Sequence, residues 1–102
     1  MVKNQVKSLP PIFGADGKPL ELTVSDHFFL CARRDDALRN ARFRLDNHLW
    51  YSMAEAVSKM GLNPLGLRVV VTDFKLDEPT LDGSLFGMYK SGYTARGTVV
   101  QR

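Results

Sequence analysis

The stretch DDALRNARFRLDNHLWYSMAEAVSKM, residues 35–60, decides the fold of this 102-residue chain. Its apolar side chains recur at steps of three and four residues: Leu38, Ala41, Leu45, Leu49, Met53, Ala56 and Met60. This spacing places them on one face of an α-helix. Asp35 and Asp36 supply N-terminal caps and a favourable charge. Gly61 suits the left-handed position after the last turn, and Pro64 bars continuation, so we predict one helix of about seven turns.

The apolar surface of this predicted helix is wider than one packed face requires. Phe43, Trp50 and Ala54 lie about 120–160° around the helix axis from Leu38, at about 100° per residue. A sheet covers only one side of a helix, so these three side chains need a second cover. We expect either the N-terminal hairpin or a second subunit to supply it, and we favour a homodimer with Phe43, Trp50 and Ala54 in the interface. The C-terminal strand is the alternative interface.

Extended segments are predicted before the helix. Residues 12–13 and 20–24 flank the stretch 14–19, whose Asp-Gly pair is typical of a hairpin turn. Residues 25–34 are compatible with a helix or a buried strand, and their aromatic content favours a strand. Residues 1–11 are predicted to form a flexible N-terminal arm, because they hold isolated valines and a Pro-Pro pair.

The segment after the helix predicts further strands. Residues 67–76 are β-branched and apolar on both faces, which favours a central strand. Residues 85–89 and 93–101 read as two strands of a hairpin, with the glycine-containing stretch 90–92 as its loop. The sequence therefore predicts a single α+β domain over residues 1–102, with one long amphipathic helix packed on a mainly antiparallel β-sheet.

The composition describes a small soluble domain and excludes a disordered chain. The sequence is 44% hydrophobic and 25% charged, which is ordinary for a globular fold. No apolar run approaches the roughly 20 residues that span a bilayer, and the N-terminus lacks the apolar stretch of a signal peptide. The single cysteine cannot form an internal disulfide. These features favour a reducing, cytoplasmic location.

The charge distribution favours an anionic partner. Lys and Arg number 14 against 11 Asp and Glu, and the positive charge gathers in residues 33–44 and 83–102, whereas the acids gather in residues 73–82. In the stretch 89–97, rings alternate with cations, as in surfaces that bind single-stranded nucleic acid. The predicted contact residues are Tyr89, Lys90, Tyr93, Arg96 and Arg102, extended by Arg33, Arg34 and Arg39.

Signatures of catalysis are missing from the sequence. It contains no phosphate-binding loop, dinucleotide fingerprint, nucleophile elbow or zinc-protease motif. His27 and Cys31 stand four residues apart, which on a helix places them on one face. A zinc site needs three or four ligands, and only His48 remains as a further one. On a strand the two lie about 13 Å apart, too far to share a metal ion. Any chain with one cysteine and two histidines permits a nucleophilic triad on paper, so Cys31 with His27 or His48 carries little information. We predict no catalytic residue, no metal and no cofactor.

The function predicted from these features is that of a non-enzymatic binding or regulatory domain that contacts nucleic acid through the C-terminal hairpin. Two alternatives remain open at this point. One is a protein–protein interaction or inhibitor module acting as a homodimer, which the short length and the surplus apolar surface fit equally well. The other is a small-ligand-binding domain or an enzyme.

Overall fold

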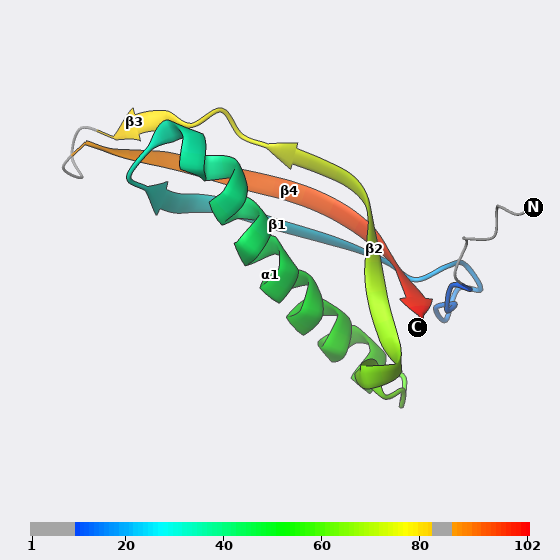
Figure 1. Ribbon diagram of the computed structural model, residues 1–102. Helices are drawn as coiled ribbons and strands as arrows, with labels where there is room; N and C mark the ends of the chain where they lie inside the picture. Colours follow the sequence, from blue (N-terminus) through cyan, green and yellow to red (C-terminus); the bar gives the residue numbers. More distant parts are fainter. Residues whose placement is uncertain (1–9, 83–86) are drawn as a thin grey trace, which may run out of the picture.

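The computed structural model describes residues 10–82 and 87–102 of the chain. In chain order the elements are β1 (Glu21–Cys31), the 3-10 helix η2 (Arg34–Asp36), α1 (Ala37–Lys59), the 3-10 helix η3 (Pro64–Gly66), β2 (Leu67–Leu76), β3 (Thr80–Asp82) and β4 (Met88–Gln101). The strands form one antiparallel sheet, and α1 packs on one of its faces (Figure 1). The predicted α+β fold with one long helix is therefore confirmed.

The central strand of the sheet is β4. It pairs antiparallel with β1 along one side, and with β3 and β2 along the other. β1 and β2 therefore run parallel to each other, and no described strand pairs with their outer edges. The prediction that residues 67–76 form a central strand is wrong, because β2 lies at an edge and leaves Val70 and Val71 exposed. The valines of β2 reflect the preference of β-branched residues for extended backbone.

A second prediction fails in β4, where residues 88–101 form one continuous strand. The predicted hairpin loop at residues 90–92 is wrong, since Ser91 and Gly92 are buried within the strand. The first strand of this predicted hairpin was residues 85–89, of which residues 85 and 86 lie outside the described part of the chain. One long strand in place of two short ones changes which side chains can share a surface.

Two glycines of β4 lie where neighbouring strands approach closely. A Cβ atom at Gly92 would lie 2.6 Å from the carbonyl oxygen of Asp26, and one at Gly97 would lie 2.4 Å from Cγ1 of Val69. Each edge strand has a bulge beside the corresponding glycine. Gly92 was predicted to be a turn residue, whereas crowding by β1 is the reason for glycine at this position.

Helix α1 contacts the sheet through residues spaced four apart. Its buried positions are Ala37, Ala41, Leu45, Leu49, Met53 and Val57. Four residues turn a helix by about 400°, so the buried line moves around the axis by about 40° at each step. The helix accordingly crosses the twisted sheet obliquely (Figure 1). Leu38 and Met60, which we predicted on the core face, are exposed for this reason.

The ends of α1 differ from each other in how well they were predicted. Gly61 adopts the left-handed conformation with φ 78°, and the N–H of Leu62 donates to the carbonyl of Val57 at 3.0 Å, as expected for this C-terminal stop. At the other end, neither η2 nor α1 has a side-chain cap. The predicted capping by Asp36 is wrong, because its carboxylate accepts from Nη2 of Arg39 at 3.0 Å.

The N-terminal segment forms the predicted hairpin. The N–H of Gly14 donates to the carbonyl of Lys18 at 2.8 Å, and the N–H of Leu20 donates to that of Ile12 at 2.9 Å. The strand interpretation of residues 25–31 is confirmed by β1. Pro10 belongs to the sheet and not to a free arm, since its carbonyl accepts from the N–H of Gln101 at 2.9 Å. Pro11 also belongs to the sheet, since it forms an antiparallel bridge with Val100, and residues 1–9 of the predicted arm lie outside the described residues.

Candidate functional site

The alternation of β4 between two faces of the sheet separates the side chains that we expected to act together. Tyr89 and Tyr93 lie on the face covered by α1, where Tyr89 is half-buried opposite Cys31. Lys90 and Arg96 lie on the opposite face and are exposed. The rings and cations of this segment therefore do not form one surface.

Tyr93 lies at the centre of the core. Its side chain is 0% exposed, and its hydroxyl lies 3.0 Å from Nδ1 of His48. The rings of Phe29 and Phe74 lie 6.4 Å and 6.2 Å from the Tyr93 ring, centroid to centroid. Burial raises the pKa of the Tyr93 phenol, and the charge of Asp26 raises it further. The prediction that Tyr93 stacks on a base is wrong, because its ring does not reach the surface.

The face of the sheet opposite α1 is polar and is referred to below as the open face. Its polar members, grouped by alternation and cross-strand pairing, are Glu21, Thr23, Ser25, Arg68, Asp73, Lys75, Thr80, Lys90, Thr94, Arg96 and Thr98. Within residues 10–82 and 87–102, no helix packs on this face. By its register opposite Met88, Asp82 belongs to the same face, so four cations stand against three carboxylates and the open face carries a small excess of positive charge.

The cations are spread along the length of β4. Lys90 and Arg96 belong to β4 itself. On β2, Lys75 pairs with Thr94, and Arg68 pairs with Val100, ten positions after Lys90. At about 3.4 Å per residue, the cations cover a track of about 34 Å. Serine and threonine hydroxyls lie between them. Such a surface offers positive charge and hydrogen-bond donors to an extended anionic chain.

Two of these cations, Lys90 and Arg96, lie close to another side chain of the open face. Nζ of Lys90 lies 5.7 Å from the ring centroid of Phe28, whose side chain is 52% exposed. Nη2 of Arg96 lies 3.6 Å from Oε1 of Glu21, an ion pair at the surface. Among the described residues Lys75 makes no ion pair. Within the part of the chain that the structure describes, Arg68, Lys75 and Lys90 are therefore the cations of the open face that no carboxylate pairs with.

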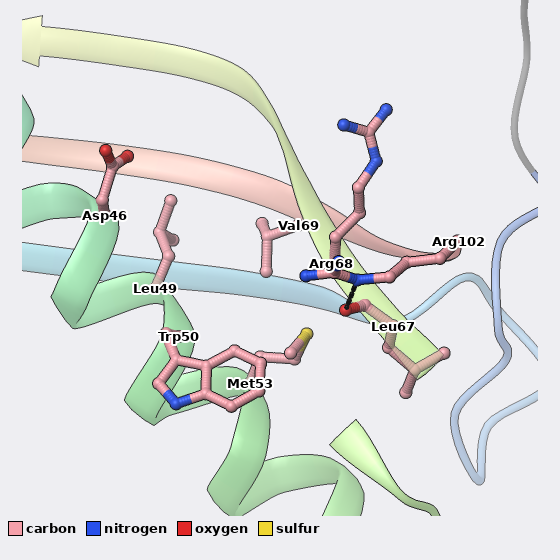
Figure 2. Close-up of a pocket in the computed structure, with 8 residues that line it drawn as sticks. All are labelled: Asp46, Leu49, Trp50, Met53, Leu67, Arg68, Val69 and Arg102. Carbon is pink, nitrogen blue, oxygen red and sulfur yellow. Dashed lines mark hydrogen bonds between the residues drawn. The ribbon is translucent and has the colours of Figure 1, made fainter. Parts of the chain in front are cut away.

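Arg102 lies at the opposite end of β4 from Lys90. Its Nε donates to the carbonyl of Leu67 at 3.1 Å (Figure 2). It lines an open cavity of 140 Å³ together with Asp46 and Trp50 of α1. Arg68, which lines the same cavity, extends away from Trp50 in Figure 2. The predicted contact residue Arg102 thus secures the end of β2.

The remaining predicted contact residues, Arg33, Arg34 and Arg39, lie at the junction between β1 and α1. Arg34 forms an ion pair with Glu78, and Arg39 forms one with Asp36. Arg33 is exposed. Two of the three guanidinium groups are therefore engaged by carboxylates and do not extend the open face as a row of free charges.

The three predicted interface residues do not form one patch. Phe43 is 72% exposed and lines a cleft beside β1. Trp50 is half-buried on the β2 side, where it packs against the buried cluster that contains Met53 and Leu67 (Figure 2). Ala54 is half-buried. The buried line turns around α1 along the helix, so these residues differ in their position relative to the sheet. Phe43 lies on the side of the helix that points away from the sheet, whereas Trp50 lies on the side next to β2.

Arg68, Lys75 and Phe28 belong to the candidate site but were not predicted from the sequence. The signal for Arg68 and Lys75 is the period-two alternation of β2 and β4, which becomes visible once residues 88–101 are one strand. Phe28 lies in the bulge of β1, where no simple alternation places it. With a loop placed at residues 90–92, the alternation was interrupted and the two faces were mixed.

The described residues give no sign of catalytic chemistry. Cys31 is buried, its Sγ lies 3.8 Å from the carbonyl oxygen of Tyr89, and burial, followed by the charge of Asp36, raises the pKa of its thiol. A raised pKa disfavours the nucleophilic thiolate. In residues 10–82 and 87–102, no three His, Cys, Asp or Glu side chains gather as a metal site would require. No helix there is long and apolar enough to cross a bilayer.

The fold and the site together define a small α+β domain with one helix-covered face and one polar, electropositive face. No family model, no curated protein and no solved structure matches this chain.

Proposed function

We propose that this chain is a non-enzymatic binding domain whose open face contacts the phosphate backbone of single-stranded nucleic acid. The observation that supports this most directly is the row of cations on an uncovered sheet face: Arg68, Lys75, Lys90 and Arg96. Lysine and arginine neutralise phosphates, and the hydroxyls between them donate hydrogen bonds to phosphate oxygens. A positively charged track of this kind is how many proteins hold single strands without sequence preference.

Phe28 takes the stacking role that the sequence analysis gave to Tyr93. Its ring is half-exposed, lies beside Lys90 and belongs to the bulge of β1. A base stacked on an exposed aromatic ring contributes about 1–3 kcal/mol to binding. The proposed surface therefore combines one aromatic platform with a cationic track. We place the domain in the cytoplasm, because the free thiol of Cys31 fits a reducing compartment.

The test is a fluorescence-anisotropy titration with short labelled DNA and RNA strands at about 50 and 200 mM salt. Three to four phosphate contacts predict a log–log salt slope of roughly −2 to −3. Lys75→Ala and Lys90→Ala each reduce the magnitude of that slope by about 0.7 and weaken all sequences about equally. Phe28→Ala weakens binding by about 1–3 kcal/mol with little change in slope.

The matched control is Lys59→Ala, which removes an exposed lysine near the end of α1, away from the open face. It leaves the affinity and the slope unchanged. Absence of binding at about 100 μM in low salt contradicts the proposal, because non-specific complexes usually reach that range. An equal effect of Lys59→Ala and Lys90→Ala contradicts the assignment to the open face.

Docking onto another protein is the second candidate function. It is favoured by Phe43 and Tyr51, which are 72% and 71% exposed on α1. Large exposed aromatic side chains are typical anchors of protein interfaces. This function predicts binding that depends on Phe43 and Tyr51 and is insensitive to Lys75→Ala and Lys90→Ala.

A further inference from the structure

A groove lies between α1 and the edge strand β2, and it is called the β2 groove below. On the helix side it is bordered by Arg42, Asp46 and Trp50, which are spaced four apart and lie about 90° around the axis from the buried line. On the sheet side it is bordered by the side chains of β2 that face α1. Two cavities, of 140 Å³ and 320 Å³, lie along it, and Asp46 lines both. The two cavities therefore adjoin.

The floor of the β2 groove is apolar. Its side chains are Met53, Leu67 and Val69 at one end (Figure 2), and Leu45, Val71 and Phe74 at the other. The ring of Trp50 is half-buried and the side chain of Val71 is 42% exposed, so apolar surface on both sides of the groove stays in contact with water. Such surface beside a sheet edge suits the alternate side chains of an added strand.

β2 turns unpaired backbone groups outward beside this groove. Val99 is the cross-strand partner of Val69, but its N–H donates to the carbonyl of Leu20 at 2.9 Å, and its carbonyl accepts from the N–H of Ile12 at 3.2 Å. Both of these bonds go to the N-terminal hairpin, on the β1 side of β4. In an antiparallel pair the direction of the backbone groups alternates, so Val69 and the residues two positions before and after it turn their N–H and C=O outward. No described strand pairs with this edge.

The charges along this edge favour an acidic occupant. The cations of β2 and of the groove lining are Arg42, Arg68, Lys75 and Arg102, and the carboxylates are Asp46 and Asp73. Across residues 10–82 and 87–102, none of these six groups forms an ion pair. Four cations against two carboxylates leave an excess of positive charge. A second copy of the chain brings the same excess to this edge, so the charge disfavours a copy and favours an acidic partner.

We propose that an extended, acidic peptide segment of a partner protein adds as a strand to the outer edge of β2, along residues 67–71. Its apolar side chains enter the β2 groove beside Trp50, and its carboxylates meet the cations of the edge. Main-chain hydrogen bonds supply affinity in this mode of recognition, and the pockets supply specificity. The bulge between Val71 and Asp73 ends the regular edge. The inference does not rest on nucleic-acid binding, and its surface is separate from Phe43 and Tyr51.

The first test uses Trp50, the only tryptophan of the sequence, as the reporter of the groove. The probe is a short peptide of alternating leucine and glutamate with aspartate at both ends, which is titrated into the full chain. We expect a saturable shift of the tryptophan emission to shorter wavelength, because bound side chains exclude water from the ring. The matched peptide with lysine in place of each acidic residue gives no saturable shift. Absence of a shift with the acidic peptide at about 1 mM overturns the proposal.

The second test changes the charge of the groove. Arg42→Glu with Arg68→Glu weakens binding of the acidic peptide about tenfold. The control, Arg33→Glu with Lys59→Glu, makes the same change of charge away from the groove and leaves the affinity unchanged. All four side chains are exposed, so circular dichroism stays unchanged in both variants. Lys90→Ala, which tests nucleic-acid binding, also leaves the peptide affinity unchanged. Equal weakening by both double variants overturns the assigned surface.

The third test concerns the backbone pairing. Only every second N–H of an added strand faces β2, so N-methylation of one alternate set of peptide nitrogens abolishes binding and methylation of the other set preserves it. Equal effects of the two sets overturn strand addition. Light scattering examines the other occupant of the edge. If it gives about twice the 11.5 kDa of one chain, and Val71→Lys restores the single-chain mass, a second copy occupies the edge and the proposal is overturned.

Discussion

The two faces of β4 share one backbone and differ in almost everything else. Between residues 91 and 99, the residues facing α1 are all buried: Ser91, Tyr93, Ala95, Gly97 and Val99. The corresponding polar residues of the open face reach the solvent to different degrees: Lys90, Thr94, Arg96 and Thr98. Side chains in a strand alternate between faces, so neighbours in sequence lie in opposite environments. The difference teaches that a cluster of residue types in a sequence becomes a surface only when its spacing matches the element that carries it.

The largest expected difference between the two faces is at Tyr93 and its neighbour Thr94. Tyr93→Ala lowers the free energy of unfolding by about 3–5 kcal/mol, because it empties the centre of the core. Thr94→Ala, one residue later on the open face, changes it by less than about 1 kcal/mol. Urea denaturation of both variants measures the contrast. Similar losses at both positions contradict the alternation assigned to β4.

The next difference concerns close packing between strands. Gly92→Ala lowers the free energy of unfolding by about 1–3 kcal/mol, since the new Cβ meets backbone atoms of Asp26 that cannot move freely. Gly66→Ala is the matched control, because nothing lies within 4 Å of a Cβ atom there and its φ is not in the left-handed region. It changes stability by about 0.5 kcal/mol or less. Equal effects in urea denaturation favour a turn at residues 90–92 and contradict the continuous strand.

The helix-covered face also predicts a pH dependence. Burial and then Asp26 raise the pKa of Tyr93 above its ordinary value of 10.0, while Arg44 partly opposes them. The unfolded chain therefore releases this proton at a lower pH than the folded chain. Above about pH 10 the unfolded state binds fewer protons, so the free energy of unfolding falls as the pH rises, by at most about 1.4 kcal/mol per pH unit.

The variant Tyr93→Phe isolates this effect. It removes the hydroxyl but keeps the ring, so it lowers stability near neutral pH by about 1 kcal/mol and reduces the loss above about pH 10. Urea midpoints of the wild type and the variant at about pH 8 and pH 11 provide the measurement. Cys31, whose pKa is also raised, contributes equally to both proteins. Parallel curves for the two proteins show that Tyr93 is not the group responsible.

The smallest expected difference is in how much the ion pair on each face contributes to the free energy of unfolding. Arg44 and Asp26 lie 2.7 Å apart with the Asp26 side chain 21% exposed, whereas Arg96 and Glu21 lie 3.6 Å apart and are both more than half exposed. Asp26→Asn lowers the free energy of unfolding by up to about 1 kcal/mol, and Glu21→Gln changes it by less than about 0.5 kcal/mol. Thermal melts at low and high salt test the order. A larger effect of Glu21→Gln reverses the comparison.

The helix, its glycine stop and the α+β class could be predicted from the sequence, because the signals for them are local. The apolar residues of the stretch 35–60 recur with a helical period. Gly61 takes the left-handed conformation that the end of the adjacent helix requires. The exact core face could not be predicted. The ideal period keeps the apolar residues on one fixed side, whereas the oblique crossing of the sheet moves the buried line from Ala37 to Val57.

The candidate site could be predicted only in part, because its assembly depends on contacts between distant segments. Lys90 and Arg96 were identified as surface cations, and both are exposed. The role expected of Tyr93 failed because the sequence does not reveal that Gly92 is crowded by β1. A glycine required by a distant backbone atom and a glycine required by a turn look the same in a sequence.

The position of β4 between β1 and β2 has a consequence for how the chain folds during its synthesis. Among the strands that the structure describes, β4 comes last in the chain, yet it is the only one that pairs with each of the others. A ribosome adds about 5–20 residues per second, so β1, α1 and β2 emerge seconds before the strand that joins them. α1 can form on its own, but the sheet waits for a partner distant in sequence, which slows folding. Until β4 arrives, the nascent chain exposes two unpaired valine- and phenylalanine-containing strands, a state in which it is a substrate for chaperones.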